Sequence, residues 1–460
     1  MRQRCLTLGE RILGFSSGHL LYPKKRSIIA IGGSPRSSGV QLLSLAALIG
    51  LLLLMAGCGT AKARNPVPAA YQDEAQVAGL PGVRGFGDSP SEALFQSAVA
   101  SVRQELAAQP GKPAGVFATP TVDLLALSGG GADGAFGAGL LCGWTEHGDR
   151  PRFKLVTGIS TGSLIAPFAF LGPEYDAKLK EVYTTISTKD IYVMRSFMKM
   201  LRSDSLADTW PMARLAASKV DAKMLADIAA EHKKGRRLFF GTTNLDAQRI
   251  VIWDMGAIAA SSHPDAPALF RKIMLASAAI PVMFPPLYLD VEAGGRRYDE
   301  LHVDGGAVAE VITYEYTFNP RAVAQEARKG MRDLKARSMR LFIVRNSKLK
   351  PEWGITQAGL KGITERALNT IIKYQGVGDL YRIYTTSKVD GVDFNLAAIP
   401  GDFDVPRQEE FDNNYMNQLF NRGYDLGRRG YPWMKHPPKL KLAIEAQEKA
   451  RATGKPPLQK

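Results

Sequence analysis

The chain has 460 residues, of which 45% are hydrophobic and 22% are charged, and its formal net charge is +15. This composition excludes a mainly disordered chain and is sufficient for one large core or two moderate ones. The sequence has only six histidines and three cysteines, and they lack the spacing of a zinc site, so no metal is expected.

Residues 42–57 form an almost unbroken apolar run that follows a basic region and ends directly before Cys58. This pattern is typical of a bacterial secretory signal, because the run is shorter than the roughly 20 residues of a membrane-spanning helix. The small residues Ala56 and Gly57 would permit cleavage before Cys58, which would then carry lipid. The segment resembles a bacterial lipobox, except that Met55 occupies the position where leucine is usual. An uncleaved membrane anchor is the alternative.

Removal of residues 1–57 would take away seven basic groups and one acidic group, so the formal charge would fall from +15 to +9. A moderately basic body suits an anionic lipid surface, whereas nucleic acid is a poor partner for an exported chain. Gly59, in place of aspartate after the lipidated cysteine, resembles the pattern for outer-membrane delivery. We therefore expect a lipid-anchored protein of the bacterial cell envelope, on its periplasmic or surface face. Cys142 would be its one unmodified cysteine, and we expect it to be buried.

Residues 58–118 are expected to form a tether followed by one helix. Residues 59–88 are rich in proline, alanine and glycine, which suits a linker. Ser89 is the expected N-cap of the helix, with Pro90 in the first helical position and Glu92 completing a capping box.

A strand, helix and strand pattern opens the main domain, which is expected over residues 119–436. Residues 122–127 form a short apolar run that ends at a glycine-rich loop, and residues 134–147 follow as a helix. Residues 153–157 form a second strand, which enters a tight turn and a further helix. This order of elements predicts a parallel sheet and an α/β fold.

Further elements are expected along the rest of this domain. The strand candidates are residues 238–243, 249–253, 287–291, 340–344 and 392–397, with a hairpin turn at 244–246 and a structural role for Asp254. The helical patterns are residues 208–231, 266–277, 363–375 and 408–429. The Lys-rich tail, residues 437–460, is expected to be a frayed, solvated helix.

Ser160 lies in a G-x-S-x-G turn between a predicted strand and a predicted helix, an arrangement that holds a serine oxygen exposed. Serine is a poor nucleophile until a neighbouring base takes its proton. His436 is the only histidine after Asp304, and its place beside two prolines makes it a weak member of a triad. Asp304 itself is the alternative base, because the two glycines after it allow a sharp turn and partial burial should raise its pKa.

The glycine loop, residues 129–134, supplies the second requirement of acyl transfer. The N–H groups of Gly130, Gly131 and Ala132, at the start of a helix, would point at the oxyanion that forms when a serine attacks an ester. The same loop satisfies the G-x-G-x-x-G fingerprint of a dinucleotide site. That alternative needs an acidic residue at the end of the second strand, where this chain has Gly158-Ile159-Ser160. The sequence therefore predicts no nucleotide cofactor.

In this order the motifs resemble the patatin-like phospholipase family. The resemblance is carried by Gly129-Gly130-Gly131 with Gly134, by Gly158 and Gly162 around Ser160, by Asp304-Gly305-Gly306, and by residues 276–281 with 284–286. It spans about residues 119–310, with the sheet continuing to about 435. The family implies a three-layer α/β/α domain with a mostly parallel central sheet. It also implies a dyad of Ser160 and Asp304, an oxyanion hole at Gly129, Gly130, Gly131 and Ala132, and an acyl-enzyme formed on membrane lipid esters without calcium.

Two residues depart from the family pattern. Asp133 stands where many members carry arginine, and Glu310 stands where asparagine often follows the Asp-Gly-Gly motif. A negative Asp133 beside the oxyanion loop is expected to disfavour anionic phospholipids and to shift preference toward neutral esters.

Two functions are compatible with the sequence. A serine acyl hydrolase that acts on membrane lipids is favoured, because Ser160, Asp304 and the glycine loop are all intact. A lipoprotein that binds lipid or a partner on the same fold, without turnover, is the alternative.

Two further segments have open roles. Residues 191–201 combine methionine and aromatic side chains with basic residues, and we expect a core-packed helix there, with an interfacial lid as the alternative. His302 lies two residues before Asp304 and so on the same strand face, and a structural role is favoured over a catalytic one.

Overall fold

The computed structural model describes residues 63–108, 121–200, 202–329, 337–438 and 440, all within the unit Gly59–Lys460. The expected signal sequence, Cys58 and most of the C-terminal tail lie outside the described residues. Within the described ranges, no helix is long and apolar enough to cross a membrane.

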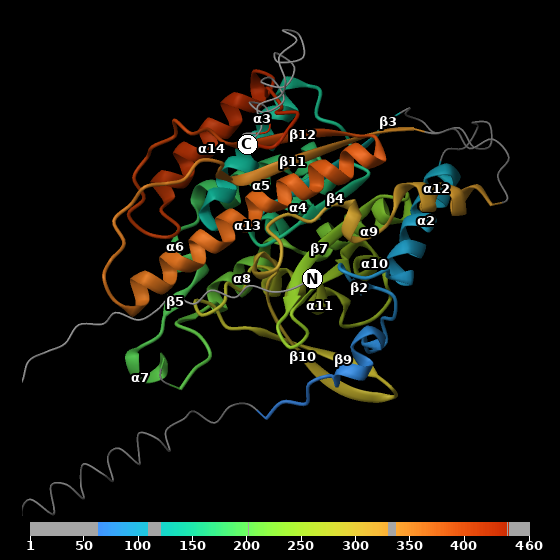
Figure 1. Cartoon of the computed structure of the whole chain (residues 1–460), viewed down its shortest axis with the longest axis horizontal. Helices are drawn as coiled ribbons and strands as arrows, with labels where there is room; N and C mark the ends of the chain where they lie inside the picture. Colours follow the sequence, from blue (N-terminus) through green and yellow to red (C-terminus); the bar gives the residue numbers. More distant parts are fainter. Residues whose placement is uncertain (1–62, 109–120, 201, 330–336, 439, 441–460) are drawn as a thin grey trace, which may run out of the picture. The chain divides into compact units, whose positions relative to one another are not determined.

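One large mixed sheet forms the centre of the domain (Figure 1), and it has ten strands in the described residues. Its spatial order is β1 (Gln76–Val77), β9 (Leu287–Ala293), β10 (Arg296–Asp304), β7 (Arg237–Asn244), β4 (Leu155–Gly158), β3 (Thr121–Leu127), β11 (Ser338–Lys348) and β12 (Val392–Ile399). β8 (Arg249–Asp254) pairs with β7 and with β2 (Arg84–Phe86). The five strands from β7 to β12 in this order run parallel, whereas β10 is antiparallel to β7 and to β9.

Helices follow most strands of the chain. They are α2 (Glu92–Ala107), α3 (Gly134–His147), α4 (Thr161–Leu171), α5 (Asp176–Thr185), α6 (Thr188–Ile191), α7 (Phe197–Met200), α8 (Trp210–Lys219), α9 (Ala222–Lys233), α10 (Met255–Ala260), α11 (Ala266–Ser277), α12 (Pro320–Arg328), α13 (Leu360–Asp390) and α14 (Asn413–Arg428). A separate two-stranded ribbon consists of β5 (Val193–Met194) and β6 (Ala207–Asp208).

Both faces of the sheet are covered, because successive side chains of a strand point to opposite faces. Leu125 and Leu127 of β3 belong to the hydrophobic cluster of α3, α4, α11 and α14. Leu124 and Ala126 of the same strand belong to the cluster that includes residues of α2 and α13. The expected three-layer α/β fold is therefore confirmed, with parallel pairing in the central strands.

The N-terminal helix begins later than the sequence indicated. Ser91, and not Ser89, is the N-cap of α2, and its hydroxyl accepts a hydrogen bond from the N–H of Leu94 at 3.4 Å. The Ser89 hydroxyl instead accepts a hydrogen bond from Arg249 at 2.8 Å. The prediction of Ser89 as N-cap is therefore wrong, because the Ser89 hydroxyl contacts Arg249, the first residue of the strand Arg249–Asp254.

Two predicted helices have different bounds in the structure. The pattern at 208–231 is divided into α8 and α9, because Asp221 caps α9 by accepting a hydrogen bond from the N–H of Met224 at 2.8 Å. The pattern at 363–375 is only part of the 31-residue helix α13.

Residues 191–200 do not form the core-packed helix that we expected. Ile191 is buried, but Phe197 and Met198 are 69% and 63% exposed. The segment leaves the core after Ile191 and pairs with β6 in the ribbon. The prediction of a core helix is therefore wrong.

Three smaller predictions are confirmed. The side chain of Asn244 accepts hydrogen bonds from the N–H groups of Asp246 and Ala247 at 3.1 and 3.2 Å, which closes the β7–β8 turn. Asp254 has a structural role as the N-cap of α10. Cys142 is buried, and burial raises the pKa of its thiol to about 12.

Candidate active site

Ser160 lies at the sharp turn between β4 and α4, at the carboxyl end of a parallel strand. Its φ angle is 52°. This left-handed conformation is strained for a residue with a side chain, and such strain is concentrated at functional sites. The side chain is nearly buried, with 7% of the residue exposed. The local geometry is that of the strand, turn and helix that presents a nucleophile.

The two glycines of the turn are required by close backbone approaches. A Cβ atom on Gly162 would overlap the carbonyl oxygen of Leu127 on β3, and one on Gly158 would lie 2.5 Å from the carbonyl oxygen of Gly162. A side chain at either position would displace the turn and, with it, the Ser160 oxygen.

Asp304 ends β10 and faces Ser160. Its Oδ1 accepts a hydrogen bond from the N–H of Gly306 at 2.7 Å, which fixes the carboxyl group. Burial raises the pKa of Asp304 to about 7, although hydrogen bonds with the side chain of Ser160 and with Gly306 lower it. A free aspartate, with a pKa near 4, would be a feeble base, whereas this one can accept a proton close to neutral pH.

Residues 277–279 form hydrogen bonds with the backbone of both Ser160 and Asp304. The hydroxyl of Ser277 accepts a hydrogen bond from the N–H of Ser160 at 3.1 Å and donates one to the carbonyl of Gly241 at 2.7 Å. Two residues later, the carbonyl of Ala279 accepts a hydrogen bond from the N–H of Asp304 at 2.9 Å. This arrangement explains why the block at 276–281 accompanies the serine and aspartate motifs.

The glycine loop lies beside this pair. Gly130 and Gly131 have φ angles of 150° and 56°, and a Cβ atom on Gly130 would overlap the carbonyl oxygen of Asn346. In the described part of the chain, neither N–H group has a hydrogen-bond acceptor, so both can serve an oxyanion. The N–H of Gly129 instead donates to the carbonyl of Glu310 at 3.2 Å. The expectation that Gly129 is an oxyanion donor is therefore wrong.

The start of α3 is equally confined. Ala132 is fully buried in the turn Gly131–Asp133, which leads into α3. A Cβ atom on Gly134 would overlap the hydroxyl of Thr161 at the start of α4. The N-termini of two helices thus converge on Ser160, and their dipoles favour negative charge there.

Glu310 brings a second carboxyl group to the site. A Cβ atom on Gly129 would lie 3.3 Å from both carboxyl oxygens of Glu310 and 3.3 Å from the Cβ of Ser160. Burial raises the pKa of Glu310 to about 8, the charge of Arg345 lowers it, and the charge of Asp304 raises it further. Nε of Arg345 donates to Ser347, but its buried Nη1 has no hydrogen-bond partner among the described residues.

A narrow cavity of about 30 Å³ opens over Ser160. Its apolar walls are Leu164, Ile191, Met212, Ile280, Phe284 and Phe411, and Gly131 and Thr161 lie beside the serine. This volume is close to the space that one water molecule occupies in the liquid. An acyl chain therefore requires the walls to separate.

A larger cavity, of about 570 Å³, lies near the starts of β3 and β11, between α2 and α12. Neither Ser160 nor Asp304 contributes to it, because both lie at the other ends of the central strands. We assign it no function.

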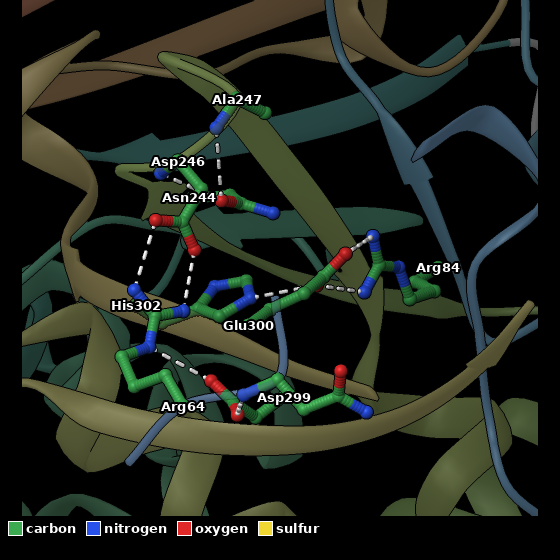
Figure 2. Close-up of polar contacts among 9 residues, drawn as sticks. Arg64, Arg84, Asn244, Asp246, Ala247, Asp299, Glu300 and His302 are labelled. Atoms are coloured by element: carbon green, nitrogen blue, oxygen red, sulfur yellow. Dashed lines mark hydrogen bonds and ion pairs between the residues drawn. The ribbon is translucent and has the colours of Figure 1, made fainter. Parts of the chain in front are cut away.

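His302 belongs to a buried polar network and not to the serine site (Figure 2). Its Nε2 lies 3.0 Å from a carboxyl oxygen of Glu300, and its Nδ1 lies 2.8 Å from the hydroxyl of Thr242. Glu300 is paired in turn with Arg84, and both side chains are almost fully buried. Burial lowers the pKa of His302. Since both ring nitrogens have partners, a structural role is favoured, as the sequence indicated.

The carboxyl group of Asp133 has its partners outside the glycine loop. It accepts a hydrogen bond from the hydroxyl of Tyr415 at 2.7 Å, and Arg407 lies 3.9 Å away. Burial raises the pKa of Asp133 to about 6, although Arg407 and Tyr415 lower it. Its charge is therefore partly compensated by residues near α14.

The convergence of a strained serine, a buried aspartate and a glycine loop can be compared with known families. Residues 125–315 match the model of the patatin-like phospholipase family. This match supports a lipid hydrolase of the patatin-like family, as the motifs indicated. A comparison with curated proteins found no match.

Among solved structures, the chain is similar to one reported as the crystal structure of VipD from Legionella pneumophila, at 11% sequence identity and a TM-score of 0.28. The alignment covers 68% of this chain and 66% of that one.

Two residues shape the site in ways that the sequence did not indicate: Ser277, which lies within the block 276–281, and Asn346, which lies outside the motifs. Ser277 supports the backbone of Ser160, as described above. Asn346, at the end of β11, accepts a hydrogen bond from the N–H of Gly137 at 3.1 Å and donates one to the carbonyl of Ser128 at 3.0 Å. It is fully buried and holds the start of the glycine loop against α3. A polar residue at the carboxyl end of an apolar strand was the available signal.

Proposed function

We propose that the chain is a serine acyl hydrolase that cleaves lipid acyl esters through Ser160 and Asp304. The observation that carries the proposal is the contact between the two residues. Ser160 occupies a strained turn, and its side chain hydrogen-bonds a buried carboxyl group whose pKa is raised to about 7. Backbone strain and a shifted pKa both reduce stability, and both are concentrated at catalytic sites.

In the proposed reaction, Asp304 takes the proton of the Ser160 hydroxyl as its oxygen attacks the ester carbonyl. The negative charge on the carbonyl oxygen is accepted by the N–H groups of Gly130 and Gly131 and by the positive ends of α3 and α4. The tetrahedral intermediate collapses, Asp304 returns the proton to the departing alcohol, and an acyl-enzyme remains. A water molecule then gives one proton to Asp304 as its oxygen attacks the acyl carbon. The second tetrahedral intermediate collapses, Asp304 returns the proton to the Ser160 oxygen, and the fatty acid is released. No metal or cofactor takes part in these steps.

The test is hydrolysis of short- and long-chain p-nitrophenyl esters and of phospholipid vesicles. Ser160→Ala and Asp304→Asn are expected to lower the rate by at least roughly a hundredfold. Ser218→Ala, at an exposed serine of α8, is the matched control and should retain the full rate. A fluorophosphonate probe should label the chain once, at Ser160. If folded wild-type protein shows no Ser160-dependent hydrolysis of any ester, the alternative of lipid or partner binding without turnover is correct.

We further propose that the chain is lipidated at Cys58 and held at the bacterial cell envelope, most simply at the outer membrane. The support is the apolar run and the small residues before Cys58. Growth with a labelled fatty acid should place the label on the wild-type chain and not on Cys58→Ser. Unchanged labelling of the variant contradicts the proposal.

Asp133 is proposed to influence the choice of head group. The support is its position at the start of α3, beside the oxyanion loop, with a charge that Arg407 compensates only in part. Asp133→Asn keeps an oxygen for Tyr415 but removes the charge, and Asp133→Arg reverses it. Both should raise hydrolysis of anionic relative to zwitterionic phospholipid, the second more than the first. An unchanged ratio in both variants contradicts this role.

A further inference from the structure

A cluster of exposed apolar side chains lies around the β5–β6 ribbon, and we call it the ribbon surface. Its members and their exposed fractions are Val193 (46%), Met194 (45%), Phe197 (69%), Met198 (63%), Trp210 (51%) and Val282 (54%). β5 pairs with β6, and the carbonyl of Val282 accepts a hydrogen bond from the N–H of Leu206 at 3.0 Å. The backbone segments that carry these side chains are therefore linked, and β5 and α7 are labelled in Figure 1.

Contiguous exposed apolar side chains of this size mark a surface that binds something apolar. Isolated exposed hydrophobic residues are common and need no explanation, but here large side chains come from several chain segments that pack together. The occupant can be argued from the position of the surface and from its charges.

Three chain segments that carry the ribbon surface also line the cavity over Ser160. In the first segment, Ile191 lines the cavity and Val193, two residues later, is exposed. In the second segment, Met212 lines the cavity and Trp210, two residues earlier, is exposed.

The third segment repeats the pattern. Ile280 and Phe284 line the cavity, and Val282 between them is exposed, with a φ angle of 71° that turns the chain outward. The same three segments thus form part of the cavity wall and part of the ribbon surface.

The charges around the ribbon surface favour an anionic occupant. Residues 193–214 carry four basic and two acidic side chains. Lys199 and Arg202 are exposed, and the guanidinium of Arg214 lies 5.4 Å from the centre of the Trp210 ring. Tryptophan beside arginine is typical of the level of lipid head groups, where the ring contacts chains and the cation contacts phosphate.

We propose that the ribbon surface docks the protein onto an anionic lipid bilayer, with the mouth of the Ser160 cavity facing the acyl chains. Phe197 and Met198 enter the boundary between head groups and chains, and Lys199, Arg202 and Arg214 contact phosphates. This inference rests on the proposed function for its choice of lipid as the occupant. The ribbon residues and the cavity walls belong to the same chain segments, so insertion of the ribbon residues would also separate the walls. The narrow cavity requires this separation to admit an acyl chain.

The experiment places one fluorescent probe on the ribbon surface. The full chain carries Ser160→Ala, so that no hydrolysis occurs, and Cys5→Ser with Cys58→Ser, so that no lipid anchor or exposed native thiol remains. Met198→Cys is labelled with an environment-sensitive dye. Val389→Cys, which is 66% exposed near the end of α13, is the matched control. The vesicles are equal parts of phosphatidylcholine and phosphatidylglycerol, or phosphatidylcholine alone.

We expect a blue shift at position 198 with the anionic vesicles, a smaller shift with phosphatidylcholine alone, and none at position 389. Lys199→Glu should raise the lipid concentration for half-maximal shift by at least about fivefold, because each basic residue near an anionic surface strengthens binding about fivefold. The absence of a shift at 198, or an equal shift at 389, overturns the proposal. A shift at 198 that appears on raising the protein concentration without vesicles marks a protein contact and also overturns it.

A second measurement separates docking from chemistry in the active chain. Phe197→Ser with Met198→Ser should lower hydrolysis of vesicle phospholipid by roughly tenfold and leave hydrolysis of a soluble short-chain ester unchanged. Val389→Ser should change neither. An equal loss of hydrolysis on both substrates contradicts the docking proposal. If the wild-type chain hydrolyses neither substrate but the probe at position 198 still shifts, only the proposed function is contradicted.

Discussion

Asp304 and Glu310 approach the same backbone position from two sides. A Cβ atom on Gly306 would lie 3.1 Å from Oδ1 of Asp304 and 3.3 Å from Oε1 of Glu310. Burial raises the pKa of Asp304 to about 7 and that of Glu310 to about 8, and the charge of Asp304 contributes to the second value. The two groups therefore lose their protons in two coupled steps, and the charge formed in the first step disfavours the second. We expect Asp304 to be the group that ionises first and acts as the base.

The rate of a soluble ester substrate should have a bell-shaped dependence on pH. It should rise through about pH 7, as Asp304 loses its proton, and fall above about pH 8, as a negative Glu310 forms beside the oxyanion loop. Glu310→Gln should remove the fall and keep the rise. A profile of kcat/KM for both proteins checks this, and a fall above pH 8 that persists in the variant means that Glu310 is not its cause.

The same two carboxyl groups should make the protein less stable as the pH rises. Each has a pKa that is higher in the folded protein than the value of about 4 in an unfolded chain, so the native state binds more protons between these values. The stabilisation that these two groups contribute is fully present below about pH 4. It is lost as the pH rises through about 7 and 8.

Asp304→Asn should therefore raise the free energy of unfolding at pH 8 by at least about 1 kcal/mol, because one unit of pKa difference is worth about 1.4 kcal/mol. Its amide oxygen can still accept the hydrogen bond of Gly306. The gain should vanish at pH 4, and urea unfolding at both pH values measures it. An equal effect at the two pH values would assign the change to packing and not to ionisation.

The sequence predicts that two of the three motifs lie close together. The glycine loop and the Ser160 turn each follow an apolar run, and the carboxyl ends of adjacent parallel strands meet at one edge of a sheet. The position of Asp304 could not be predicted this way, because β10 runs antiparallel and its run of charged and polar residues does not look like a strand. The scarcity of histidines after Asp304 and the two glycines that follow it indicate Asp304 as the base, and the family resemblance implies the same pairing with Ser160.

Other features of the site depend on contacts that no local pattern encodes. Methionine and aromatic residues at 193–198 have the composition of a buried face, and only the pairing of β5 with β6 carries them out to solvent. Gly129 looks equivalent to Gly130 and Gly131 in the sequence, but the carbonyl of Glu310 takes its N–H. Glu310 departs from the family pattern, but no local pattern in the sequence indicates its contact with the site.

Helix packing behind the glycine loop offers a test of stability. A Cβ atom on Gly139 of α3 would overlap the carbonyl oxygen of Phe420 on α14, so Gly139→Ala must push the helices apart. We expect a loss of about 3 kcal/mol in the free energy of unfolding. Gly378→Ala, in α13, is the matched control, because its Cβ would meet no atom within 4 Å. The control should be unchanged or more stable by up to about 1 kcal/mol, since alanine favours helix. Equal stability of the two variants would contradict the close contact of α3 and α14.

The buried ion pair of Arg84 and Glu300 should be costly to break. Burial alone would raise the pKa of Glu300, but the charge of Arg84 and the hydrogen bonds of His302 and Arg84 lower it to about 2. Arg84→Met would leave a buried carboxylate without its cation, and we expect a loss of about 3–5 kcal/mol.

The matched control for this pair is the exposed pair of Arg422 and Asp402, whose atoms lie 2.7 Å apart. Arg422→Met should cost less than about 1 kcal/mol, because water screens an exposed pair and its side chains lose entropy when they pair. Denaturant unfolding of both variants measures the difference. Because His302 shares the carboxylate of Glu300, Arg84→Met should also raise the pKa of His302, since its neighbouring positive charge is removed. A small loss of stability with an unshifted His302 signal in NMR would mean that Glu300 is neutral in the folded protein.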